Sequence, residues 1–181
     1  MTKSLSIIIG STRTNRVGKA IADWAAEQAT HAGFETIEFI DLKELDLPKF
    51  DAEVSPMYAP IDTPEARAWG KVITDSERLL VLTPEYNRSV PSDLKSAIDT
   101  LFAEWADKPT AIISYGYIEG GKNAGLHLRD ILTHLRTDLA ADTAAIQLSE
   151  TLVSDGAVQA DELSEDIRTA VTATLSALAA K

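Results

Sequence analysis

The stretch LSIIIGSTRTNRVG, residues 5–18, decides the fold class. Its first five residues are nearly all apolar, which is typical of a strand that is buried on both faces. The polar residues 10–16 follow, and after them Val17, Ile21 and Trp24 recur at helical spacing. A buried strand, a polar turn and an amphipathic helix in this order indicate the start of a parallel α/β sheet.

The same alternation continues along the chain. Two further apolar runs, residues 79–83 and 110–114, predict buried strands, and residues 34–40, with two glutamates, predict a half-exposed edge strand. Residues 143–148 form a fifth, weaker run. Apolar residues at helical spacing predict helices near residues 17–28, 63–73, 91–101, 124–135 and 163–178. We therefore predict a three-layer α/β sandwich in which helices flank a five-stranded parallel sheet of strand order 2-1-3-4-5.

The length and composition predict a single globular domain over residues 1–181. The chain has no cysteine, so disulfides, thiolate metal sites and cysteine nucleophiles are excluded, and any redox chemistry depends on a cofactor. Residues 43–62 contain three prolines and exceed a normal connection. They form either a loop that faces the active site or a partner, or a short element that pattern analysis does not reveal.

Net charge and apolar patterning restrict the partners. The formal net charge is −11, from 17 basic and 28 acidic residues, which argues against broad binding to nucleic acid. No apolar run approaches the roughly 18 residues that a membrane span needs, and the first apolar stretch is too short for a signal peptide. We expect a cytoplasmic protein that acts on small-molecule substrates, without nucleic-acid or membrane partners.

Ligands of open α/β sheets bind beyond the carboxyl ends of the strands, which draws attention to three loops. The first, residues 10–18, joins a buried strand to a helix, so free backbone N–H groups and the helix dipole favour an anion there. Arg13 and Arg16 suit a phosphate, because charge-assisted contacts of this kind contribute about 1.5–3 kcal/mol. The alternative is a plain polar turn that caps the helix, which needs neither arginine. The loop matches neither a Walker A sequence nor G-x-G-x-x-G.

The second and third loops predict a slot for a flat ring. Residues 84–91 place an aromatic ring and an amide between two prolines, and such a rigid rim can stack on a heterocycle and hydrogen-bond to it. Residues 114–125 hold four of the nine glycines, which indicates close backbone approach to a ligand or, alternatively, tight turns alone. Together the three loops predict a phosphate-binding end with a flat, polar slot beside it.

These motifs resemble the NADPH-dependent FMN reductase family over about residues 5–135. The resemblance rests on GSTR at 10–13, PEYN at 84–87, Pro91, LKSAID at 94–99 and SYG at 114–116. It implies a flavodoxin-like fold with bound FMN, NADPH or NADH as the hydride donor, and assembly as a homodimer or homotetramer. The family often has serine where Arg16 stands and a second glycine where Tyr117 stands, so Tyr117 could narrow the slot.

The resemblance also implies which residues bind the cofactor. Ser11, Arg13 and the Asn15–Arg16 stretch would hold the FMN phosphate, with Gly10, Thr12 and Val17 as the rest of that loop. The isoalloxazine ring would lie between Pro84, Glu85, Tyr86 and Asn87 on one side and Ser114, Tyr115 and Gly116 on the other. No residue is expected to act as a catalytic acid or base, because FMN carries the hydride, and no metal site is expected.

The chain is therefore predicted to be an FMN-dependent NAD(P)H oxidoreductase that passes a hydride from the nicotinamide nucleotide through FMN to a small acceptor. That acceptor is free flavin, a quinone, an azo compound or a metal oxyanion. The alternatives are a flavodoxin-type electron carrier without its own nicotinamide site, and a protein that keeps the fold but binds no flavin. Trp24 and Trp69 are expected in the core, and Trp105 either in the core or at a subunit contact.

Overall fold

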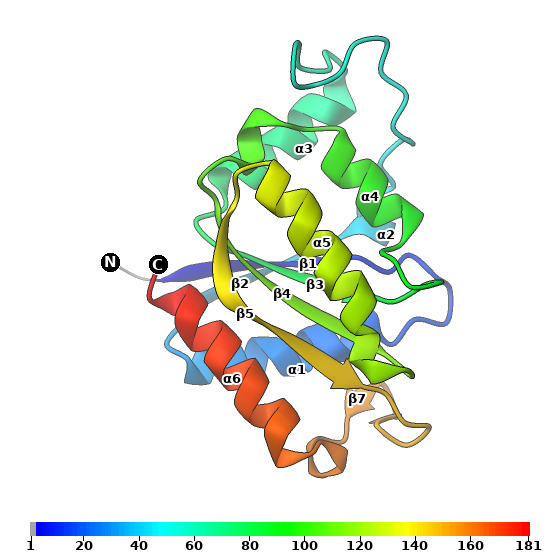
Figure 1. Cartoon of the computed structure of the whole chain (residues 1–181), viewed down its shortest axis with the longest axis vertical. Coiled ribbons are helices and arrows are strands. Elements are labelled where there is room, and N and C mark those ends of the chain that lie inside the picture. Colours follow the sequence, from blue (N-terminus) through cyan, green and yellow to red (C-terminus); the bar gives the residue numbers. More distant parts are fainter. Residues whose placement is uncertain (1–2) are drawn as a thin grey trace.

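The computed structural model describes residues 3–181 and has a parallel sheet with helices on both faces (Figure 1). The main sheet has the strand order β2-β1-β3-β4-β5, and each neighbouring pair is parallel. This is the flavodoxin-like order, so the predicted fold class is confirmed. The strands are β1 Ser4–Ile9, β2 Thr36–Asp41, β3 Leu79–Pro84, β4 Pro109–Gly116 and β5 Asp138–Gln147.

Helices occur at the five places where helical spacing predicts them, four between strands of the main sheet and one after the last strand. A short further helix, α2, was not predicted. Side-chain caps start α3 and α6, where Thr63 accepts from the N–H of Ala66 and Ser164 from that of Ile167. No helix within residues 3–181 combines the length and the apolar character needed to cross a bilayer. The helices are α1 Gly18–His31, α2 Leu42–Leu45, α3 Pro64–Asp75, α4 Ser92–Asp99, α5 Lys122–His134 and α6 Glu165–Ala179.

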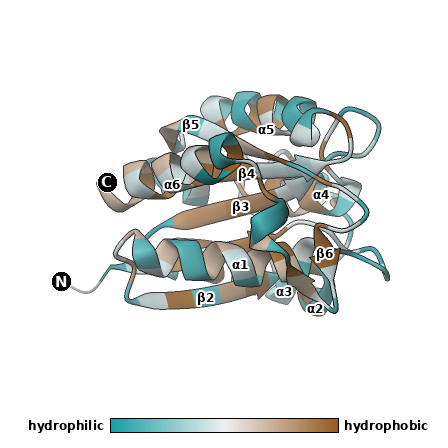
Figure 2. Cartoon of the chain, turned by 90° about the horizontal axis from the view of Figure 1, so that it is seen from below, coloured by the Kyte–Doolittle hydropathy of each residue, from teal (hydrophilic) through white to brown (hydrophobic). Residues whose placement is uncertain are grey.

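The pleat of β1 explains why its apolar run is continuous. Ile7 and Ile9 face the core that the sheet shares with α1 and α6, whereas Ile8 faces the core shared with α3, α4 and α5. Helices cover both faces of the sheet (Figure 2). Burial of each such side chain beneath them contributes about 1.5–3 kcal/mol. At the sheet edge, β2 exposes Glu38 and Phe39, as expected of a half-exposed strand.

Three tryptophans are in the core. Trp24 and Trp69 are buried, as predicted, and Trp105 is only 1% exposed. The rings of Trp69 and Trp105 meet edge to face, with centroids 6.2 Å apart. Each indole N–H donates to a carbonyl of α4, Trp69 to Ala97 at 2.8 Å and Trp105 to Ile98 at 3.2 Å. The alternative that Trp105 forms a subunit contact is therefore wrong, because its ring is covered within the chain.

The long connection after β2 does contain a hidden element. Helix α2 begins directly after Asp41, whose carboxylate accepts from the N–H of Lys43 at 3.0 Å. The following residues 46–63 are irregular and expose Phe50 and Tyr58. A small hairpin, β6 Val153–Ser154 and β7 Ala157–Val158, lies between β5 and α6 and was not predicted.

The carboxyl ends of β1, β3 and β4 lie next to one another. Ile9 pairs with Leu82, and Pro84 pairs with Tyr115. The loops that follow these strands are therefore brought together at one edge of the sheet.

Candidate functional site

Three loops meet at this edge: the first loop (residues 10–17), the second loop (residues 85–91) and the third loop (residues 117–121). The hydroxyls of Ser11 and Tyr86 are 2.8 Å apart, which joins the first loop to the second. The juxtaposition expected from the strand order is thus present.

The first loop offers a row of backbone donors. Within residues 3–181, the N–H groups of residues 11–15 donate no hydrogen bond to the chain. Helix α1 starts at Gly18 without a side-chain cap, so its first N–H groups are free as well. Gly10 brings the loop close to β3, since a Cβ there would lie 2.7 Å from the carbonyl oxygen of Leu82. Free donors at the positive end of a helix suit an anion.

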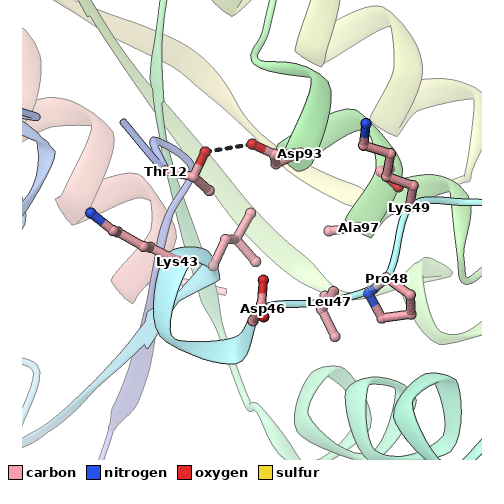
Figure 3. Close-up of a pocket in the computed structure, with 10 residues that line it drawn as sticks. Thr12, Lys43, Asp46, Leu47, Pro48, Lys49, Asp93 and Ala97 are labelled. Carbon is pink, nitrogen blue, oxygen red and sulfur yellow. Dashed lines mark hydrogen bonds between the residues drawn. The ribbon is translucent and has the colours of Figure 1, made fainter. Parts of the chain in front are cut away.

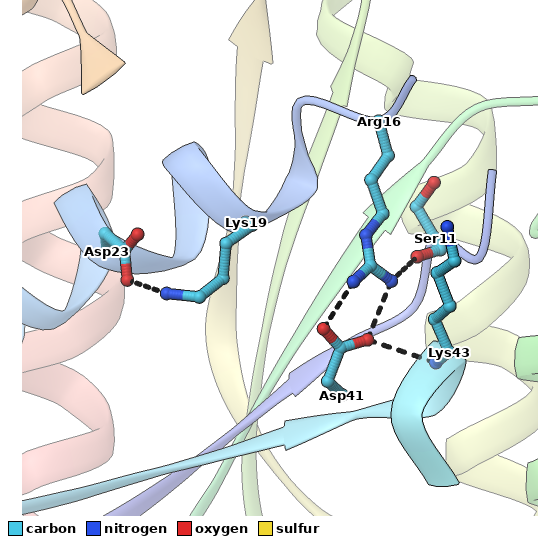
Figure 4. A network of polar contacts seen from close by, with 6 residues as sticks. All are labelled: Ser11, Arg16, Lys19, Asp23, Asp41 and Lys43. Carbon is cyan, nitrogen blue, oxygen red and sulfur yellow. Dashed lines mark hydrogen bonds and ion pairs between the residues drawn. The ribbon is translucent and has the colours of Figure 1, made fainter. Parts of the chain in front are cut away.

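The guanidinium of Arg16 is engaged within the protein (Figure 4). Its Nη1 and Nη2 donate to the two carboxylate oxygens of Asp41, at 2.7 and 2.5 Å, and Nη1 also donates to the carbonyl oxygen of Ser11 at 2.7 Å. The two side chains are 13% and 6% exposed. Arg16 therefore ties the first loop to the end of β2, and its charge is already balanced by Asp41.

Arg13 is placed differently. It is exposed, and its guanidinium carbon lies 5.9 Å from the centre of the Tyr86 ring. It forms no ion pair with any residue in the described range 3–181. Asn15 is also exposed, while the hydroxyl of Thr12 donates to Asp93 on α4. Arg13 thus remains a cation without an internal partner.

The second loop is a tight turn. Tyr86 and Ser89 exchange both backbone hydrogen bonds, at 2.9 and 3.1 Å. Asn87 and Arg88 between them have φ of 50° and 66°, which is a type I′ arrangement. Asparagine adopts this conformation readily, but in arginine it costs roughly 1–2 kcal/mol. Arg88 is held by a 2.9 Å hydrogen bond to the side-chain oxygen of Asn123. The turn presents the exposed Asn87 at the rim.

The carboxylate of Glu85 is bound at the start of α5. Its Oε2 accepts from the backbone N–H groups of Asn123 and Ala124, at 2.9 and 3.2 Å, so it caps α5. Helix α5 has Gly121 at its N-cap and thus no capping side chain of its own. The Glu85 carboxylate therefore joins the second loop to α5, and the prediction that Glu85 borders the ring stays a prediction.

Three other predicted ring contacts lie below the surface. Pro84 is buried at the end of β3, and Ser114 and Tyr115 are 0% and 2% exposed. The hydroxyl of Ser114 donates to the carbonyl oxygen of Gly120 at 3.1 Å. Because these side chains are covered, any contact of the three residues with a ring would come from their main chain, and their place beside the ring stays a prediction. Gly116, half-buried at the end of β4, remains at the slot.

The side chain of Tyr115 extends beneath the first loop instead. A Cβ placed on Gly18 would lie 2.6 Å from its phenolic oxygen. This oxygen is buried and has no hydrogen-bond partner among the described residues. Burial raises the pKa of the Tyr115 phenol, and the neighbouring Tyr86 raises it further. The phenol is thus a neutral, unpaired donor below the loop.

The third loop consists of tight turns with an exposed tip. Gly120 and Gly121 have φ of 63° and 74°, so the alternative explanation of the glycines, tight turns, holds for these two. Gln147 fixes the loop, since its side chain accepts from the N–H of Gly120 and donates to the carbonyl of Tyr117. Tyr117 and Ile118 are 65% and 71% exposed at the tip.

A cavity of about 480 Å³ adjoins the first loop, between α2, the residues after it and α4 (Figure 3). The hydrogen bond from Thr12 to Asp93 forms one wall, and Lys43 and Lys49 lie on opposite sides of it. Among residues 3–181, no three His, Cys, Asp or Glu side chains are arranged to hold a metal ion. Of the predicted binding residues, this cavity includes Thr12 alone.

Four polar residues that hold the loops were missed by sequence reasoning. A positional signal exists for all of them once the strands are assigned, because each lies at the carboxyl edge of the sheet. Two are the last residues of strands, and two lie in the first turns of helices. They are Asp41 at the end of β2, Gln147 at the end of β5, Asp93 in α4 and Asn123 in α5.

Comparison with known proteins adds to this geometry. The model of the NADPH-dependent FMN reductase family matches residues 4–150. An NAD(P)H-dependent FMN reductase of Schizosaccharomyces pombe is 31% identical over 160 residues, which cover 87% of this chain and 80% of the relative. An NAD(P)H:quinone oxidoreductase of Solanum tuberosum is 32% identical over 183 residues, 96% of this chain and 91% of the relative.

A solved structure shares the fold. It is that of FerB from Paracoccus denitrificans, a flavoenzyme NAD(P)H:(acceptor) oxidoreductase, which superposes with a TM-score of 0.76 at 24% identity. The match covers 99% of this chain and 98% of FerB. At this level of sequence identity, the similarity shows only that the two proteins share the fold.

Proposed function

Because this chain belongs to the NADPH-dependent FMN reductase family, we propose that FMN binds between its first, second and third loops and that NAD(P)H reduces a small acceptor there. The enzyme class, an FMN-dependent NAD(P)H oxidoreductase, follows from the family. The chemistry that bound FMN supplies is hydride acceptance from the nicotinamide and delivery of two electrons to a second substrate. The observation that carries the placement is the row of backbone donors at residues 11–15 that have no acceptor in the described residues, just before the start of α1.

The residues of the first loop fit the phosphate of FMN. Its N–H groups point to no acceptor within the described chain, and Arg13 has no internal counter-charge. We assign the phosphate to the backbone of residues 10–17, with Ser11, Arg13 and Asn15 as side-chain donors. An arginine–phosphate contact contributes about 1.5–3 kcal/mol, more than the roughly 0.3–1 kcal/mol of the helix dipole.

Arg16 has a supporting role in this proposal. Its guanidinium is bound to Asp41 and to the carbonyl of Ser11, so it keeps the loop in shape while Arg13 supplies the free charge.

The ring of FMN fits the slot beside this loop. The half-buried Tyr86 supplies an aromatic wall, Asn87 an exposed amide and Gly116 the main chain at the end of β4. Backbone N–H groups at the rim are suited to stabilise negative charge on a reduced ring. The exposed Tyr117 stands where the nicotinamide and the acceptor would enter in turn.

For the acceptor we favour a quinone, with free flavin, azo compounds and metal oxyanions as the other members of the proposed range. Relatives named as quinone oxidoreductases support this choice. The proposed enzyme is a single domain, acts in the cytoplasm, where nicotinamide nucleotides are available, and assembles as a homodimer or homotetramer. The apolar side chains that residues 46–61 expose support an assembly, among them Phe50, Met57 and Tyr58.

Anaerobic rapid mixing tests the function. FMN-loaded protein mixed with NADPH is expected to lose its visible flavin absorption promptly, and a quinone added afterwards restores it. A flavodoxin-type carrier would hold the flavin but would not be reduced promptly by NADPH. Protein that stays colourless after incubation with excess FMN and desalting would remove the proposal.

A further inference from the structure

The hydroxyl of Tyr115 contributes to neither the sheet nor the proposed ring site. The residue is 2% exposed, and its phenolic oxygen has no hydrogen-bond partner within the described residues. An unpaired buried donor costs about 1–3 kcal/mol. Such a group is therefore expected to have a partner in some state of the molecule, and its surroundings identify that partner.

The phenol of Tyr115 and the side chain of Ser11 lie close to the same point, the Cα of Gly18. A Cβ placed on Gly18 would lie 2.6 Å from the phenolic oxygen and 3.6 Å from Cβ of Ser11, so all three meet below the first turn of α1. Burial and then Tyr86 raise the pKa of the phenol, whereas Ser11, Arg16 and Arg13 lower it. All of these residues except Tyr86 lie in the first loop.

Ser11 is itself the junction of the loops. It is 2% exposed, and its hydroxyl is 2.8 Å from that of Tyr86. A serine hydroxyl donates one hydrogen bond and accepts two. If the phenols of Tyr86 and Tyr115 fill both acceptor positions, the single hydrogen of Ser11 is left to point outward at an anion in the first loop.

We propose, on the basis of the proposed FMN function, that Tyr115 is a positioning residue for the FMN phosphate. Its O–H donates to Oγ of Ser11 when the phosphate is bound, and this orients the O–H of Ser11 toward a phosphate oxygen. The order of donation is Tyr115 to Ser11 to phosphate. Hydroxyls linked in one direction toward a negative charge polarise one another and strengthen each bond.

The protonation of the phenol agrees with this role. Burial raises the pKa of Tyr115 above its ordinary value, so the side chain keeps its proton throughout the neutral range. It is therefore a donor under working conditions. In the ligand-free protein, loss of the hydroxyl removes an unpaired buried donor and should raise stability. In the FMN-loaded protein it removes a hydrogen bond to Ser11 and should lower stability.

The test compares FMN with riboflavin, which lacks the phosphate, by fluorescence titration of ligand-free protein. Tyr115→Phe keeps the ring and removes the hydroxyl. We expect FMN to bind about tenfold more weakly and riboflavin to bind as before. The melting temperature of the ligand-free variant should equal or exceed that of the wild type. Tyr58→Phe, at an exposed tyrosine in the connection after α2, is the matched control and should leave both affinities unchanged.

A second comparison examines the path through Ser11. If Tyr115 acts through this residue, Ser11→Ala with Tyr115→Phe should lose no more FMN affinity than Ser11→Ala alone. Additive losses, or equal losses for FMN and riboflavin, would show that the phenol acts by packing and would overturn the inference. Wild-type protein that binds neither flavin would instead remove the proposed function.

Discussion

Separate removal of the two partners of the Arg16–Asp41 pair tests whether Arg16 braces the first loop or contacts phosphate itself. The pair is bidentate, at 2.7 and 2.5 Å, and its side chains are 13% and 6% exposed. We consider three variants: Arg16→Met, Asp41→Leu and both together. Each single change leaves one charge in a mostly covered position without its partner.

The expected loss is large for the single variants and small for the double one. Removal of one partner of a buried pair costs about 3–5 kcal/mol, whereas replacement of both by apolar side chains is often close to neutral. For a chain of this size, about 2–4 °C of melting temperature corresponds to 1 kcal/mol, so each single variant should melt roughly 6–20 °C lower. The double variant also loses the cap that Asp41 provides at the N–H of Lys43, which costs about 1 kcal/mol.

Thermal unfolding of ligand-free protein measures these losses, and titration with FMN measures affinity in parallel. The exposed pair of Lys19 and Asp23 supplies a control, because its side chains are 50% and 49% exposed. Asp23→Asn should cost less than about 1 kcal/mol. It should leave FMN affinity unchanged.

The double variant decides between the two roles. If Arg16 acts as a brace, the double variant regains most of the stability and binds FMN within about tenfold of the wild type. A double variant that is as stable as the wild type but binds FMN more than about 100-fold more weakly would refute the reasoning, because Arg16 would then contact the phosphate directly.

Two further predictions concern residues with an assigned position. Arg13→Ala should weaken FMN binding about 10–100-fold in a fluorescence titration. The control Arg67→Ala, which removes the partner of the distant Asp62, should leave FMN affinity unchanged. An unchanged dissociation constant for Arg13→Ala would exclude Arg13 from the site. Trp105→Ala should cost about 3–5 kcal/mol in chemical unfolding yet leave the mass by light scattering unchanged, because the ring is 1% exposed within the chain; a smaller assembly at unchanged stability would contradict this.

The fold was predictable because the parallel sheet is covered on both faces. That covering turns β1, β3 and β4 into short apolar runs, and the exposed face of β2 left Glu38 in its pattern. The short α2 was not predictable from apolar periodicity, since four residues are barely one turn. The carboxylate of Asp41 caps the start of this short helix.

The meeting of the loops after β1, β3 and β4 was predictable, but the directions of their side chains were less so. Residues of the PEYN and SYG motifs were assigned to one slot, although a strand points alternate side chains to opposite faces. Tyr115 lies two residues after Ile113 and shares its core with α1, while Ser114 follows Ile112 to the other face. Strict use of this period would have placed the phenol under the first loop. The pair of Arg16 with Asp41 had no comparable signal, because the partners are brought together by the pairing of β1 with β2.

Several groups that lower the stability of this chain lie at the carboxyl edge of its main sheet. Elsewhere the starts of α3 and α6 are capped by side chains, but the start of α1 and the N–H groups of residues 11–15 have no internal acceptors in the described chain. The phenol of Tyr115 has no hydrogen-bond partner among residues 3–181, and Arg88 adopts a left-handed conformation. A ligand that binds only the folded chain stabilises it in proportion to the logarithm of its concentration over its dissociation constant. Because the unpaired donors lie near the first loop, the stabilisation by FMN should be greatest there. Amide exchange at the start of α1 should therefore slow more on FMN binding than exchange at the start of α6.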